Sequence, residues 1–163
     1  MIAVSDSSPL ITLTKIGYLE LLPILYGLIT ITPEVHSEVV SAGSNLAGAS
    51  QVRVASWVRV TPAPSGLSTV RQRTGLGAGE VSAIVLAVEL KADLILVDDM
   101  RARKAAQFEG LAVLGCVGIL RDAFGQGLLG DLTLAYRRLL DSGAYVSREL
   151  LERILDSRGL PLL

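Results

Sequence analysis

The chain has 163 residues, of which 50% are hydrophobic and 19% are charged, with a formal net charge of -1 at pH 7. This length and composition predict one folded domain and exclude a disordered protein, while the charge excludes a global basic field, so any nucleic-acid binding requires a local patch. Cys116 is the single cysteine, which excludes an internal disulfide and a cysteine-based zinc site, and we expect it to be a buried small hydrophobe.

The N-terminal part of the chain predicts two buried strands, each followed by a helix. Residues 2–4 form a short apolar run, and Ser8-Pro9 then gives a cap and a first-turn proline for a helix through Thr14. Residues 28–31 are β-branched and short, and Thr32-Pro33 repeats the cap-and-proline signal. The apolar segment 19–31 is interrupted and short for a membrane span, so we expect no membrane insertion.

The middle of the chain is less regular than its flanks. Residues 41–51 and 61–68 predict a loop and a linker, and residues 52–60 are compatible with a strand or a helix. Beyond them, the pattern alternates again. We expect helices over residues 80–90, 101–108 and 117–124, and strands over residues 94–97 and 111–114.

The alternation of strands and helices predicts an α/β fold with a mainly parallel sheet that has helices on both faces. Residues 131–155 differ, because they read as two amphipathic helices split near Ser142-Gly143. We therefore divide the chain into a core of residues 1–129 and a C-terminal helical extension of residues 130–163, packed on the same domain.

Acidic residues recur at the ends of the predicted elements. Asp6 and Asp98-Asp99 follow two of the strands, while Glu38 and Glu80 lie near the starts of two helices. Functional groups of parallel sheets gather beyond the carboxyl ends of the strands, so these carboxylates share one crevice if the two strands are neighbours. Their mutual repulsion would then be relieved by a hard divalent cation such as Mg²⁺ or Mn²⁺.

Each acid also has a structural interpretation. Asp6 and Glu80 could cap helices, Glu34 could stabilise a helix dipole, and Glu38 could be a solvated surface acid. One carboxylate of Asp98-Asp99 is expected to start the next helix while the other points to the crevice. The joint pattern, with its matching positions, favours a site over four separate coincidences.

Other polar features carry less chemistry. His36 has no partner at metal-ligand spacing, so we expect a surface residue. The glycine-rich turn at residues 75–79 lacks a preceding strand and a following Lys-Ser or Lys-Thr, so we expect it to position Glu80 and not to bind a phosphate. Cationic side chains near the acids could grip a polyanion: Arg71, Arg73, Arg101, Arg103 and Lys104.

Four segments together resemble the PIN domain superfamily, and more closely its prokaryotic VapC-like branch, which includes DUF3368-like proteins. They are Val4-Ser5-Asp6-Ser7-Ser8-Pro9-Leu10-Ile11, Pro33-Glu34-Val35-His36-Ser37-Glu38-Val39, Gly79-Glu80-Val81-Ser82-Ala83-Ile84-Val85-Leu86-Ala87 and Leu96-Val97-Asp98-Asp99-Met100-Arg101-Ala102-Arg103. Their order is the order of the family, and the resemblance extends to Leu129.

The resemblance implies a three-layer α/β/α sandwich and a ribonuclease that depends on Mg²⁺ or Mn²⁺. By position, it implies four catalytic acids in chain order, Asp6, Glu38, Glu80 and Asp98. It implies metal ligation by Asp6, Glu80 and Asp98, with Asp99 as a competitor of Asp98. Ser8 matches a small polar position near the metal, and with Arg101, Arg103 and Lys104 we expect it to bind substrate.

The chain departs from the family pattern at two places. The third acid is commonly aspartate, and here it is Glu80, with a longer arm. The fourth motif has adjacent aspartates followed by arginines, where an aspartate ahead of an aromatic residue is usual.

Three functions remain open. The first is a cytoplasmic ribonuclease, the toxin of a two-gene pair, with an RNA substrate, an antitoxin partner and a homodimer formed through the C-terminal helices. The second is a catalytically weak module that binds RNA or protein. The third is a phosphatase of the haloacid-dehalogenase type, which needs a second aspartate two residues after Asp6, where this chain has Ser8.

Overall fold

The central sheet has five parallel strands in the order β3-β2-β1-β4-β5. The computed structural model describes residues 1–42, 52, 55–65, 70 and 75–163. The predicted loop at residues 41–51 lies outside these residues except for its first two, and Arg71 and Arg73 lie outside them entirely. The strands are β1 (Ala3–Ser5), β2 (Ile29–Ile31), β3 (Val58–Val60), β4 (Leu94–Leu96) and β5 (Val113–Leu114).

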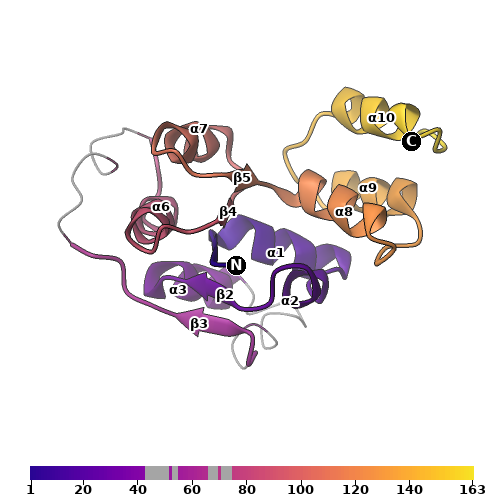
Figure 1. Cartoon of the computed structure of the whole chain (residues 1–163). Helices are drawn as coiled ribbons and strands as arrows, with labels where there is room; N and C mark the ends of the chain where they lie inside the picture. Colours follow the sequence, from indigo (N-terminus) through magenta and orange to yellow (C-terminus); the bar gives the residue numbers. More distant parts are fainter. Residues whose placement is uncertain (43–51, 53–54, 66–69, 71–74) are drawn as a thin grey trace.

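Helices cover both faces of this sheet. Figure 1 shows α6 and α7 on one side of the strands and α1 and α2 on the other, which confirms the expected three-layer α/β/α arrangement. The helices are α1 (Ser7–Ile16), α2 (Leu21–Tyr26), α3 (Pro33–Ala42), α6 (Ala78–Glu89), α7 (Met100–Phe108), α8 (Cys116–Gly125), α9 (Leu132–Asp141) and α10 (Arg148–Ser157). No helix in the described part of the chain is both long enough and apolar enough to cross a membrane.

The strands are buried because helices close both faces. The side chains of Ile29, Ile31, Ile95 and Leu96 are all 0% exposed, so the strands carry continuous apolar runs and not an alternating pattern. The ambiguous region at residues 52–60 ends in strand β3, which lies at the edge of the sheet. Among the residues of this region that the structure describes, only 58–60 have the strand conformation.

The two expected C-terminal helices are present as α9 and α10. Helix α9 buries Tyr136 completely, and the Tyr136 hydroxyl donates to the Val117 carbonyl of α8 at 3.1 Å. Helix α10 packs on α9 and buries Leu151 and Leu155. These side chains join the same continuous hydrophobic cluster as those of the sheet.

The strand order places a topological switch between β1 and β4. From β1 the chain moves to β2 and β3 on one side, and it returns to β4 and β5 on the other. Ser5 pairs with Leu96, and the Asp6 amide donates to the Leu96 carbonyl at 2.9 Å. The two strands that precede Asp6 and Asp98 are therefore neighbours, at the position where ligands bind in open parallel sheets.

A buried hydrogen bond joins the end of β2 to helix α6. The hydroxyls of Thr32 and Ser82 lie 2.7 Å apart, and Ser82 also donates to the Gly79 carbonyl at 2.9 Å. Thr32 Oγ1 in turn accepts from the Val35 amide at 3.2 Å in the first turn of α3. These hydrogen bonds connect α3 and α6, the helices that carry Glu38 and Glu80, near their N-terminal ends.

We expect Ser82→Ala to lower the free energy of unfolding by about 1–3 kcal/mol, because the buried Thr32 hydroxyl loses a partner. Urea unfolding measures the change. Ser157→Ala is the matched control, since Ser157 also makes a 2.7 Å bond, to Ile154, but in an exposed setting. Equal losses in the two variants would show that the Thr32–Ser82 bond adds nothing specific.

Candidate functional site

Asp6 is a buried carboxylate with an unsatisfied oxygen. Its side chain is 2% exposed, and Oδ1 is buried without a hydrogen-bond partner. Asp6 occupies the N-cap position of α1, yet its side chain makes no capping hydrogen bond there. The helix-cap interpretation of Asp6 therefore does not account for this side chain.

The surroundings of Asp6 oppose its ionisation. Burial, above all, and the negative charges of Glu80 and Glu38 raise the pKa of Asp6 to about 7, although the nearby amides of Ser7 and Ser8 act in the opposite direction. Because the charges of both glutamates act on this pKa, the carboxylates of Asp6, Glu38 and Glu80 are close enough to interact electrostatically. This group of acids therefore carries excess negative charge. No cation among the described side chains is a cause that lowers the pKa of Asp6.

Glu38 is held from two sides. The Ser7 hydroxyl donates to Glu38 Oε2 at 2.6 Å, and the Gly79 amide donates to Oε1 at 3.0 Å. These contacts join α3 to the first residue of α1 and to the N-terminus of α6. A Cβ at Gly79 would collide with the Glu38 carboxylate, so the absence of a side chain there permits the contact. Glu38 is thus a positioned group and not a freely solvated surface acid.

Glu80 begins α6 and is partly engaged in local structure. Its Oε2 accepts from the Gly77 amide at 2.8 Å, as an acid in the first turn of a helix commonly does. The capping interpretation of Glu80 therefore holds for one of its two oxygens. The side chain is half-buried and lines a cleft, so the carboxylate is accessible as well as charged.

The adjacent aspartates have separate roles, as the sequence suggested. Asp99 Oδ1 accepts from the amides of Arg101 and Ala102 at 2.9 and 3.0 Å and so caps α7. Asp98 points the other way, where Oδ1 accepts from the Cys116 amide at 2.7 Å and Oδ2 accepts from the Cys116 thiol at 3.1 Å. Cys116 is buried as expected, but it also fixes the Asp98 carboxylate.

The structure brings Asp6, Glu38 and Glu80 together electrostatically and places Asp98 on the neighbouring strand. Within the described ranges, no three His, Cys, Asp or Glu side chains lie close enough together to ligate one metal ion. The donor set is nevertheless made of oxygen atoms, and Mg²⁺ commonly takes only one or two carboxylates along with water molecules. The unsatisfied Oδ1 of Asp6 is the atom that most needs a positive partner.

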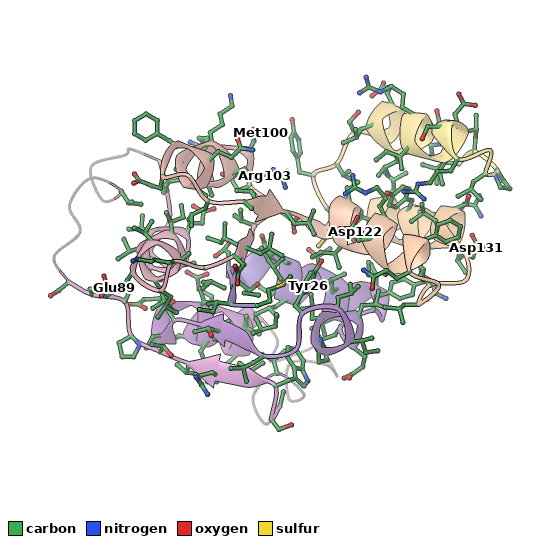
Figure 2. The ribbon with its side chains drawn as sticks, in the orientation of Figure 1. Tyr26, Glu89, Met100, Arg103, Asp122 and Asp131 are labelled. Atoms are coloured by element: carbon green, nitrogen blue, oxygen red, sulfur yellow. The ribbon has the colours of Figure 1, made fainter. Side chains whose placement is uncertain are left out.

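A cleft of about 1020 Å³ opens beside these acids. Glu80, Asp98, Ser8 and two arginines, Arg101 and Arg103, contribute to its lining, together with residues of α8, α9 and α10. Figure 2 shows Arg103 on the side of α7 that faces the C-terminal helices. Ser8 Oγ is buried and has no hydrogen-bond partner, which leaves it free to meet a ligand. Lys104 is exposed and does not line the cleft.

Three residues that position the acids were missing from the sequence prediction. Ser7 and Gly79 hold Glu38, and Cys116 holds Asp98. Ser7 follows Asp6 directly, and Gly79 belongs to the glycine-rich turn that we assigned to Glu80 alone. Both signals were visible in the sequence, but their partner is 31 or 41 residues away. His36 is half-buried on α3 and is not among these contacts.

Comparisons with known proteins agree with this architecture. A family model, the PIN domain of DUF3368, matches residues 2–159 of the chain. A solved structure of a PilT N-terminus domain protein from the hyperthermophilic archaeon Sulfolobus solfataricus P2 is similar, with a TM-score of 0.51 and 22% sequence identity, over 76% of this chain and 93% of that chain. At this identity the likeness supports the fold alone. A comparison with curated proteins gives no match.

Proposed function

This chain belongs to the PIN domain family DUF3368, and from that premise we propose that it is a metal-dependent ribonuclease that hydrolyses RNA phosphodiester bonds. PIN domains are commonly metal-dependent nucleases, which is the general expectation for the family. The choice of RNA, of Mg²⁺ or Mn²⁺ and of particular residues is our proposal for this chain.

One observation carries the proposal. Asp6 is buried, its Oδ1 lacks a hydrogen-bond partner, and Glu38 and Glu80 add their charges to its surroundings. A carboxylate in such a place destabilises the fold unless a cation or a proton neutralises it. The all-oxygen donor set suits Mg²⁺ or Mn²⁺ better than zinc or copper, which favour nitrogen and sulfur.

We assign Asp6 as the central metal ligand and Glu80 and Asp98 as the candidates for a second carboxylate ligand, because no three described acids lie within reach of one ion. When bound, the cation would stabilise the charge of a phosphate and lower the pKa of a water molecule. Asp99 remains a competitor of Asp98, because the two cap amides use only its Oδ1 and its side chain also lines the cleft. The carboxylate of Asp98 is fixed in direction by Cys116, so it does not need to be reoriented to face the cleft.

Glu38 is assigned a different role, as the group that orients the attacking water. Ser7 and Gly79 each donate to it, and these two hydrogen bonds fix the direction of its carboxylate. An oriented carboxylate can accept a proton from water as the phosphorus–oxygen bond forms. Ser8, Arg101 and Arg103 are assigned to the phosphate backbone, because hydroxyl and guanidinium groups donate to phosphate oxygens.

The test is cleavage of a 5′-labelled single-stranded RNA by the full chain with Mn²⁺, Mg²⁺ or excess EDTA. We expect cleavage with either metal ion, none with EDTA, and about a tenfold loss of rate in Glu80→Gln, which keeps the shape of the side chain but removes the charge. Glu89→Gln is the matched control, since Glu89 is exposed at the other end of α6 and does not line the cleft (Figure 2).

Cleavage that survives EDTA, or that is equal in both variants, would contradict the proposal. Metal binding and RNA binding without cleavage would instead favour the binding-module hypothesis. The resemblance also implies an antitoxin partner and a homodimer. We keep both as part of the proposal that this nuclease is the toxin of a two-gene pair.

A further inference from the structure

We propose that Tyr145, on the connection between α9 and α10, is a stacking platform for a base of the RNA strand that occupies the cleft. The inference rests on the proposed function for the identity of the strand. It adds a specificity-determining residue from the C-terminal helical pair, far in sequence from the acids. It also gives α10 a role as the second wall of the substrate groove.

Tyr145 has an exposure that its packing does not explain. Its relative exposure is 110%, the largest among the exposed large hydrophobic side chains, and it lines the same cleft as Glu80 and Asp98. A tyrosine usually buries most of its ring, so a fully solvated ring at a cleft is free for a ligand. Nucleobases offer a flat face of suitable size to such a ring.

The backbone around Tyr145 is anchored. Ala144 and Val146, on either side, pack against the hydrophobic core, while Tyr145 faces away from it. The Ser142 hydroxyl donates to the Leu139 carbonyl at 2.7 Å and accepts from the Ala144 amide at 3.3 Å. The ring is therefore presented from a fixed segment, which lowers the entropy lost when a base stacks on it.

The charge of the opposite wall selects a polyanion as the occupant. Arg101 and Arg103 belong to α7, and residues of both α7 and α10 line the cleft. Figure 1 shows these two helices standing apart from each other. The guanidinium of Arg101 makes no ion pair with any residue that the structure describes. A groove with the cationic side chains of Arg101 and Arg103 on one wall and an aromatic ring on the other has the composition of a single-strand binding site.

The cleft is continuous from Glu80 and Asp98 to Tyr145. Its volume of about 1020 Å³ lies at the upper limit of pockets for single small ligands, which run to about 1,000 Å³. A polymer that is cut at the acids must continue in one direction along the groove. The continuity therefore favours a strand of RNA over a separate small molecule or a protein segment.

The test measures binding of a fluorescein-labelled single-stranded RNA by anisotropy, in the full chain with Asp6→Asn to prevent cleavage. We expect Tyr145→Ala to weaken binding at least about fivefold and Tyr145→Phe to leave it within twofold of the parent, because stacking needs the ring and not the hydroxyl. Ile24→Ala is the control, since Ile24 is 61% exposed on α2 and does not line the cleft.

A second measurement locates the contact. A set of RNAs, each with one abasic position, is titrated against the Asp6→Asn parent and against its Tyr145→Ala derivative. At one position the missing base should weaken binding to the parent but leave binding to Tyr145→Ala unchanged. Equal binding by Tyr145→Ala and its parent, or no abasic position with this behaviour, overturns the inference and leaves the cleft to a protein partner. If wild-type protein fails to cleave RNA while both binding results hold, the proposed function fails and the stacking site stands.

Discussion

Asp6→Asn is expected to lower the rate of metal-dependent RNA cleavage by about a thousandfold, the largest effect of any single substitution in this chain. Removal of a group that holds the cation or a catalytic proton typically costs between about a hundredfold and ten-thousandfold. Asp6 is the acid whose Oδ1 has no hydrogen-bond partner, and asparagine removes its charge. The amide that replaces it is nearly isosteric.

The same substitution is expected to make metal-free protein less sensitive to pH. The pKa of Asp6 rises from 3.8 to about 7 on folding, so between these values the folded protein binds more protons than the unfolded one. Stability therefore falls as the pH rises through this window, by about 4 kcal/mol in total when the group is fully ionised. Asp6→Asn cannot ionise, so this loss should be absent from the variant.

Chemical denaturation at several pH values between 4 and 8, in EDTA, measures the difference. Mn²⁺ should then restore the stability of wild-type protein at pH 8 but not change that of Asp6→Asn, because a ligand that binds the folded state stabilises it. Asp156→Asn, at an exposed position near the end of α10, serves as the control. Parallel pH curves for wild type and Asp6→Asn would refute the electrostatic account of this site.

Gly79→Ala is expected to reduce cleavage about a hundredfold while leaving the fold at least as stable. A Cβ at position 79 would collide with the carboxylate of Glu38, and that carboxylate is the free end of a flexible side chain. Glu38 would therefore move, and a displacement of about 1 Å at a catalytic group can cost a hundredfold in rate. Alanine also favours the helix over glycine by about 1 kcal/mol, which offsets the loss of the contact.

The comparison that tests this idea uses four further variants. Gly125→Ala adds the same methyl group at the end of α8, where nothing lies within 4 Å, and should leave cleavage unchanged. Glu38→Gln should be at least as damaging as Gly79→Ala, and the double variant no worse than Glu38→Gln alone. Glu34→Gln, one turn earlier on α3, should be neutral because Glu34 is exposed. Additive losses in the double variant would mean that Gly79 does not act through Glu38.

The fold was largely predictable because the local signals agreed with one another. Apolar runs gave the strands β1, β2 and β4, and cap-and-proline pairs gave the starts of α1 and α3. The strand β3 was ambiguous because it is short and lies at an edge, with Val60 46% exposed, so neither alternation nor continuous burial marks it. The strand order itself came from the structure, since periodicity does not say which strands pair.

The site was predictable at the level of which acids matter, and much less in how each is held. Asp6 and Asp98 follow strands β1 and β4, and the sheet topology places these two strands side by side. The groups that hold Glu38 and Asp98 come from remote segments, so their partners cannot be read from local spacing. Tyr145 was not predicted from the sequence either, because the exposure of its side chain depends on how its two neighbours pack in the folded protein.

The two edges of the sheet are both short, with three residues in β3 and two in β5. Short edges offer few backbone groups for pairing with another chain, and natural proteins use this to limit edge-to-edge association. A second copy of the chain would gain only a few hydrogen bonds by extending the sheet. Any stable self-association should therefore be helical in character, and concentrated solutions should resist growth into continuous β-structure.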